Sequence, residues 1–154
     1  MLWFARRLEL RKKHLLLRLL LASTIVAVNS TTPSANADEI WISEGRMISW
    51  LDSRGDTAIF KMQNTGGNNV YFYIGGLASD VTKSRGSYTG YWVTRDNGQR
   101  QCATSREFHA GRFSYNWGRF DITFIGNRFP YKWTARYGQC DRSLDQSMQA
   151  VPFP

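Results

Sequence analysis

The chain has 154 residues, of which 20 are Lys or Arg and 12 are Asp or Glu, so its formal net charge is +8 at pH 7. This composition excludes a polytopic membrane protein, a coiled coil and a collagen-like chain. Six basic residues and one acidic residue fall within residues 1–37, which leaves a balance of only +3 for the 117 residues that follow. The basic character therefore does not indicate a nucleic-acid partner, and the length after position 37 suits one domain.

The first 37 residues have the three-part order of a secretory signal peptide. A basic stretch at Arg6–Lys13 precedes an apolar stretch at Leu15–Val28, and a polar stretch then leads to Ala35-Asn36-Ala37. We expect Sec-type export by a bacterium, cleavage after Ala37, and a periplasmic or secreted protein. An uncleaved anchor is the alternative, but the run from Leu19 to Val28 has ten residues, whereas a membrane-spanning helix needs about 20.

Cys102 and Cys140 are the only cysteines in the chain. In an oxidising compartment, an even number of cysteines in a small domain predicts a disulfide. A zinc site needs four protein ligands, or three and a water, whereas residues 38–154 contain one histidine beside the two cysteines. We therefore expect a Cys102–Cys140 disulfide, no metal and no cofactor.

From Asp38 onward, apolar and polar residues alternate between clusters of Gly, Asn and Asp, without a sustained helical period. This pattern predicts an all-β domain. The expected strands are Ile40–Ser43, Met47–Leu51, Thr57–Gln63, Asn69–Ile74, Tyr88–Arg95, Gln99–Thr104, Arg112–Asn116, Trp117–Ile125 and Phe129–Tyr137. Asn97-Gly98 is the strongest hairpin signal. We expect a small antiparallel meander, and favour a closed barrel over a two-layer sandwich.

Two segments lack this alternation. Gly75–Ser87 is long, polar and flanked by glycines, and we expect a mobile surface loop there. Residues 143–154 contain two prolines and little periodicity, which predicts a flexible C-terminal tail. The expected organisation is a signal peptide at 1–37, an all-β domain at 38–142 and a tail at 143–154.

The alternation in the predicted strands Trp117–Ile125 and Phe129–Tyr137 also predicts how they pair. One register places three apolar pairs on the buried face, and an ion pair and a cation–π pair on the outer face. Its pairs are Phe124 with Phe129, Ile122 with Tyr131, Phe120 with Trp133, Asp121 with Lys132, and Trp117 with Arg136. Because Pro130 has no N–H for a ladder hydrogen bond, we expect a four-residue loop at Ile125–Arg128.

The sequence contains no recognisable catalytic constellation. His109 is the only histidine after the leader, and Glu107 precedes it by two residues, but no known pattern places a Ser or Cys nucleophile near them. A surface position explains His109 better. A small hydrolase that uses Glu107 and His109, or a carboxylate pair in the Gly75–Ser87 loop, is the least favoured hypothesis, and we expect no enzyme.

Residues 38–154 contain 20 Trp, Tyr and Phe residues, about twice the share of an average domain. Most of them are expected in the core. Trp117, Tyr71 and Tyr73 alternate with the apolar residues of their strands, so we expect these three to point away from the core and to be exposed. In addition, 11 of the 14 basic residues in this part are Arg, which suits carboxylate, sulfate or phosphate groups.

Exposed rings among Arg and Asp are typical of a glycan-binding face, because a ring stacks on a sugar while polar neighbours bond its hydroxyls. The expected ligand-binding residues are Trp117, Arg119, Asp121, Arg136, Tyr71 and Tyr73. We predict a non-catalytic module for a glycan or another envelope or extracellular ligand, with no nucleic acid and no stable membrane span after cleavage. The alternative is an exported, virulence-associated protein that binds a protein partner, since Tyr, Trp and Arg also favour protein contacts.

Overall fold

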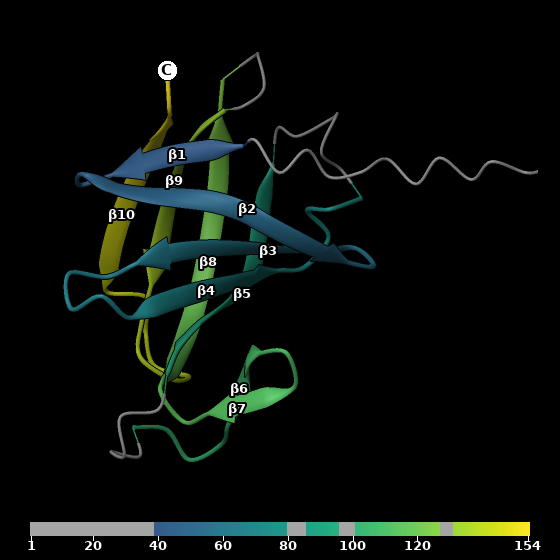
Figure 1. Cartoon of the computed structure of the whole chain (residues 1–154), viewed down its shortest axis with the longest axis vertical. Coiled ribbons are helices and arrows are strands. Elements are labelled where there is room, and N and C mark those ends of the chain that lie inside the picture. Colours follow the sequence, from purple (N-terminus) through teal and green to yellow (C-terminus); the bar gives the residue numbers. More distant parts are fainter. Residues whose placement is uncertain (1–38, 80–85, 96–100, 127–130) are drawn as a thin grey trace, which may run out of the picture. The chain divides into compact units, whose positions relative to one another are not determined.

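The computed structural model describes residues 39–79, 86–95, 101–126 and 131–154. The elements found there are all strands: β1 (Ile40–Ser43), β2 (Arg46–Arg54), β3 (Thr57–Gln63), β4 (Asn69–Ile74), β5 (Ser87–Thr94), β6 (Arg106–His109), β7 (Arg112–Ser114), β8 (Trp117–Ile125), β9 (Lys132–Tyr137) and β10 (Gln146–Pro152). Eight of them close an antiparallel barrel in the order β1-β10-β9-β8-β5-β4-β3-β2, and β6 pairs with β7 outside it (Figure 1). The predicted all-β closed barrel and the Cys102–Cys140 disulfide are confirmed.

Four predicted features lie wholly or partly outside the described residues. These are the signal peptide at 1–37, the Asn97-Gly98 turn, most of the loop before β9 and the middle of the Gly75–Ser87 loop. At the start of that loop Leu77 is fully buried, so this part of the segment belongs to the core. Within the described residues, no helix is long and apolar enough to cross a membrane.

Strand boundaries follow the alternation closely in half of the barrel strands. Four strands have the predicted bounds: β1, β3, β4 and β8. The predicted strand at Gln99–Thr104 is wrong for its described part, because residues 101–105 form no strand. The pairing of this region is instead made by Arg106–His109 with Arg112–Ser114.

The C-terminal segment contains a barrel strand where we expected a flexible tail. β10 pairs with β9 on one side and with β1 on the other, and thereby closes the ring. Ala150 is buried and Met148 packs against the core, whereas Gln149 and Val151 are exposed. A strand that satisfies two open sheet edges gains tertiary hydrogen bonds and burial, and this gain outweighs a weak local signal.

Large apolar side chains fill the interior of the barrel. Trp41, Trp133 and Phe60 are among the largest fully buried residues. The rings of Trp41 and Phe60 stack with their centroids 5.1 Å apart, and Nε1 of Trp41 donates a hydrogen bond to the carbonyl oxygen of Tyr131 at 2.8 Å. As in other small barrels, the interior is a packed core.

The register of β8 with β9 differs from the predicted register by four residues. The observed pairs include Asp121 with Arg136, Ile122 with Ala135, Phe124 with Trp133, and Ile125 with Lys132. Four predicted pairs are therefore wrong: Asp121 with Lys132, Trp117 with Arg136, Ile122 with Tyr131, and Phe120 with Trp133. Because the shift is even, each described side chain of the hairpin keeps its predicted face. The predicted loop at Ile125–Arg128 and its neighbour Phe129 lie mostly outside the described residues, and β9 begins at Lys132.

A second layer lies outside the barrel. We call residues 101–116 the strap; it contains the β6–β7 hairpin and is joined through Cys102 to Cys140, 38 residues later in the chain. Its residues form an apolar cluster with outward-pointing residues of β3, β4, β5 and β8. The buried members are Ile59, Tyr71, Tyr73, Val93, Cys102, Phe108 and Trp117. The strap therefore covers one side of the barrel.

Candidate functional site

Trp117 points out of the barrel, as its alternation predicts, but it is not exposed. The strap covers its ring, which is 1% exposed, and Nε1 donates a hydrogen bond to the carbonyl oxygen of Thr104 at 2.7 Å. Tyr71 and Tyr73 are each 5% exposed, and Phe108 of the strap packs edge-on against Tyr71. The prediction that Trp117, Tyr71 and Tyr73 offer exposed rings is wrong, because strand alternation gives the face of a side chain and not what covers it.

The strap places Arg106 over the aromatic residues that it covers. The guanidinium carbon of Arg106 lies 4.6 Å from the ring centroid of Trp117 and 5.6 Å from that of Tyr91. We call Arg106, Trp117 and Tyr91 the arginine stack. Burial raises the pKa of Tyr91 to about 12, so its phenol is neutral near pH 7. Arg119 is the cross-strand partner of Tyr91 and is exposed, so it lies beside the arginine stack.

Glu107 and His109, the residues considered for hydrolysis, have other partners. Glu107 accepts hydrogen bonds from Nη1 of Arg54 at 2.6 Å and from the backbone N–H of Gly111 at 3.2 Å. The hydrogen bond from Arg54 is the main cause that lowers the pKa of Glu107, so this carboxyl is held in its ionised form. The ring of His109 stacks on Tyr71 with the centroids 4.9 Å apart.

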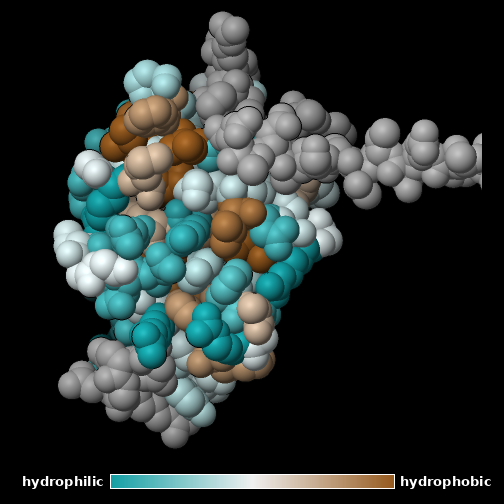
Figure 2. Space-filling model, in the orientation of Figure 1, coloured by the Kyte–Doolittle hydropathy of each residue, from teal (hydrophilic) through white to brown (hydrophobic). Residues whose placement is uncertain are grey.

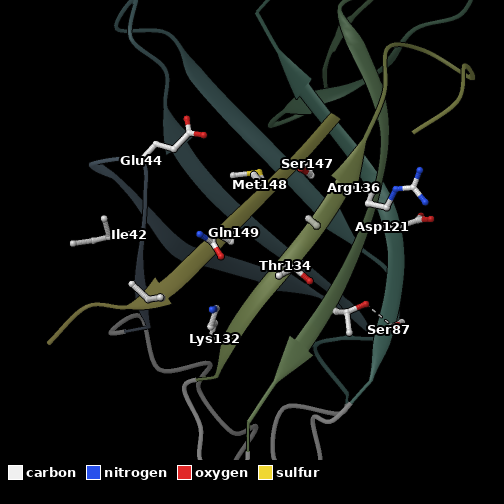
Figure 3. Close-up of a pocket in the computed structure, with 13 residues that line it drawn as sticks. Ile42, Glu44, Ser87, Asp121, Lys132, Thr134, Arg136, Ser147, Met148 and Gln149 are labelled. Atoms are coloured by element: carbon white, nitrogen blue, oxygen red, sulfur yellow. Dashed lines mark hydrogen bonds between the residues drawn. The ribbon is translucent and has the colours of Figure 1, made fainter. Parts of the chain in front are cut away.

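An open hollow of about 950 Å³ crosses the outer face of β8, β9, β10 and β1 (Figure 3). We call it the groove. Its lining residues are Ile42, Glu44, Ser87, Asp121, Thr123, Lys132, Thr134, Ala135, Arg136, Ser147, Met148, Gln149 and Val151. Figure 3 shows Asp121 and Arg136 together at one side of the groove, and Ile42 with Glu44 at the other.

The middle of the groove is a row of hydroxyl and amide side chains that crosses four strands. Ser87 pairs with Thr123, Thr123 with Thr134, and Thr134 with Gln149. The hydroxyl oxygens of Ser87 and Thr123 are 2.8 Å apart and hydrogen-bonded. Because such residues are neighbours across strands, their donors and acceptors form a continuous polar track.

A charged row borders this track on one side. Asp121 lies opposite Arg136, and Nη2 of Arg136 donates a hydrogen bond to the carbonyl oxygen of Leu144 at 2.6 Å. That bond ties the end of β9 to the segment that leads into β10. Arg136 therefore helps to position β10, which contributes Ser147, Gln149 and Val151 to the groove lining.

An apolar row borders the track on the other side. Val151, which is 46% exposed, pairs with Ile42, and Ile42 pairs with Met47, which is 55% exposed. On the face drawn in Figure 2, hydrophobic residues gather near the C-terminus, whereas hydrophilic residues cover much of the remainder. The groove thus combines apolar, hydrogen-bonding and charged side chains.

The structure divides the six predicted binding residues between two places. Asp121 and Arg136 line the groove, whereas Trp117, Arg119, Tyr71 and Tyr73 are not among its lining residues. Ser147 and Gln149 were not predicted, because the C-terminal segment reads as a tail. The sequence signal that could have predicted a strand here is the alternation of Met148 and Ala150 with the polar residues Ser147 and Gln149.

No protein-family model, curated protein or solved structure matches the chain. Among the described residues, no group of three or more His, Cys, Asp or Glu side chains could hold a metal ion. The described part of the chain offers two candidate binding surfaces, the groove and the surface around the arginine stack.

Proposed function

We propose that the chain is an exported, non-catalytic binding module whose groove takes a segment of a protein partner. The composition of the groove carries this proposal, because exposed apolar side chains border a polar track and charges of both signs. A polypeptide segment suits such a surface. Its apolar side chains are removed from water, while its backbone amides find hydrogen-bond partners.

A protein partner is favoured over a glycan because the groove offers no aromatic platform. None of its lining residues is Trp, Tyr or Phe. Trp117, Tyr71 and Tyr73, which were expected to stack on a sugar, are buried. A sugar in the groove would lack the ring contact that contributes most to its recognition.

Export is part of the proposal and has two supports. The order of basic, apolar and polar residues in 1–37 is that of a signal peptide. The Cys102–Cys140 disulfide is of a kind that persists in oxidising compartments. We place the action of the protein in the periplasm or outside the cell.

A glycan is the second candidate, and the polar track is the observation in its favour. Ser87, Thr123, Thr134 and Gln149 align donors and acceptors across four strands. Sugar hydroxyls both donate and accept, so they match such a track. Lys132 at the edge of the groove would add a cation for an acidic sugar.

A screen against a displayed random-peptide library and a glycan array tests this function, with selected ligands measured by biolayer interferometry. Thr134→Arg fills the middle of the groove with a long side chain. We expect peptides to be selected and their affinity to fall at least tenfold in this variant. Ser49→Arg is the matched control, because it adds the same side chain to β2 at a position outside the groove lining.

Peptide affinity that is unchanged in Thr134→Arg, or equally reduced in Ser49→Arg, contradicts the proposal. A library that yields no peptide also counts against it. If only glycans bind, and Thr134→Arg alone abolishes their binding, the second candidate replaces the first.

A further inference from the structure

Arg106 is held in place, but within the described part of the chain it has no anionic partner. A guanidinium that stacks on rings has its flat faces occupied, while its five N–H donors point outward along its edge. Among the described residues, the ion pairs join Arg46 to Glu44 and Arg54 to Glu107, and none includes Arg106. The Arg106 side chain lies over the rings of Trp117 and Tyr91.

The rings beneath Arg106 are fixed by their own partners. Nε1 of Trp117 is hydrogen-bonded to the carbonyl oxygen of Thr104, 2.7 Å away, in the same strap that carries Arg106. Tyr91 stacks on Tyr73 with the centroids 4.8 Å apart and the planes 9° from parallel. Arg106 is therefore positioned before any ligand arrives, which lowers the entropy cost of binding.

Arg119 supplies a second cation at the same place. It pairs with Tyr91 across strands and follows Trp117 by two residues, so all three point to the same face of the sheet. Its side chain is exposed, and it forms no ion pair within the described part of the chain. Arg119 thus adds a second arginine on the sheet face that carries both rings.

The carboxylate that follows Arg106 in the chain is bound by other groups. Glu107 accepts hydrogen bonds from Arg54 and from the backbone N–H of Gly111. Asp121 follows Arg119 by two residues on β8, and no ion pair among the described residues joins the two. The positive charge of the two arginines is therefore available to a ligand.

We propose that Arg106 and Arg119 form an oxyanion-binding site for the sulfate, phosphate or carboxylate group of an acidic ligand. The oxygen atoms of the ligand accept hydrogen bonds from the edge of the Arg106 guanidinium, and Arg119 adds a second charge-assisted contact. The site goes beyond the binding of a partner in the groove and does not depend on it.

The test uses anions of defined chemistry at low ionic strength, where surface electrostatics is least screened. Dextran sulfate and neutral dextran of the same length are titrated into the protein, and inorganic sulfate and phosphate are titrated separately. Because Arg106 lies on Trp117, we expect a saturable change in Trp fluorescence with the anions and none with dextran. Vesicles of phosphatidylglycerol, compared with phosphatidylcholine, reveal whether a lipid headgroup also supplies the anion.

Variants are compared by isothermal titration calorimetry and not by fluorescence. Replacing Arg106 removes its contact with Trp117, and the fluorescence change depends on that contact. We expect Arg106→Gln and Arg119→Gln each to weaken dextran sulfate binding at least tenfold. Arg46→Gln is the matched control, because it removes the same charge from β2, which lies opposite β8 in the ring. Its affinity is expected to stay within twofold of the unmodified protein.

An equal loss in all three variants shows attraction by net charge alone and overturns the site, as does a titration without binding. Arg119 is exposed on a barrel strand, so its variant tests the site even if Arg106→Gln fails to fold. Thr134→Arg is expected to retain dextran sulfate binding, and this separates the oxyanion site from the groove.

Discussion

The environment of Glu39 disfavours the charge of its carboxyl. Its Oε2 atom is buried without a hydrogen-bond partner among the described residues, and burial raises the pKa of the carboxyl to about 7. The ordinary pKa of this group is 4.5. Between these two values the unfolded chain is ionised while the folded protein keeps the proton, so stability declines as pH rises.

Replacing Glu39 with Gln is expected to stabilise the protein at pH 8, because the buried charge is removed. After allowance for solvent screening the gain is about 1 kcal/mol, and most of it disappears at pH 4, where both states hold the proton. Urea denaturation at the two pH values measures this difference. Glu44→Gln, which removes an exposed carboxylate that pairs with Arg46, is expected to give no gain at either pH. Equal free energies of unfolding for Glu39→Gln and the unmodified protein at pH 8 would contradict the prediction.

At the scale of elements, the strap is the part of the fold that depends most on a covalent bond. Its two strands are short and pair only with each other, and Cys102 joins it to Cys140. The strap in turn shields Trp117 and Tyr71 from solvent, and it places Arg106 over the ring of Trp117. The disulfide therefore supports the proposed oxyanion site as well as the stability of the domain.

The double variant Cys102→Ser/Cys140→Ser is expected to lose about 4 kcal/mol of unfolding free energy, because the unfolded chain regains the freedom of a loop that spans a sequence separation of 38. Urea denaturation under oxidising conditions measures the loss, and the unmodified protein in dithiothreitol serves as the control. A loss below about 1 kcal/mol would contradict a stabilising role of the bond. Weaker dextran sulfate binding in the folded variant is expected as well.

At the scale of the whole molecule, the segment that follows β9 packs closely against the start of β8. Nε1 of Trp92 donates a hydrogen bond to the carbonyl oxygen of Gly138 at 3.1 Å. A Cβ atom added to Gly118 would clash with this carbonyl oxygen and lie 2.6 Å from Nε1 of Trp92. Only a glycine lets the two segments come together at this point.

Gly118→Ala is therefore expected to destabilise the barrel by about 3 kcal/mol or more, as overpacking against backbone does. Thermal unfolding followed by circular dichroism measures the shift of Tm. Gly66→Ala is the matched control, because the nearest atom to its added Cβ is the side-chain Oδ1 of Asn64, at 3.4 Å in a turn. A Tm shift of equal size in both variants would contradict the prediction, because it would show that the close packing around Gly118 has no special effect on stability.

The fold class was accessible from the sequence because alternation of apolar and polar residues is a local property. In β8, Phe120, Ile122 and Phe124 are all buried, as the alternation predicts, although their partners are displaced by four residues. An even shift preserves the faces, so the pattern could not distinguish the two registers. The pairing of Cys102 with Cys140 was equally accessible, since the chain contains no other cysteine.

The functional surfaces were decided by tertiary structure. Trp117 has the outward direction that its position in β8 predicts, but the strap, which precedes it in the chain, buries it and covers it with Arg106. The groove exists because β10 joins β9 to β1, although its own segment reads as a tail. A sequence determines the face to which a side chain points, because that depends on neighbouring residues. Whether that face meets solvent depends on which distant segments pack over it, and only the folded chain decides this.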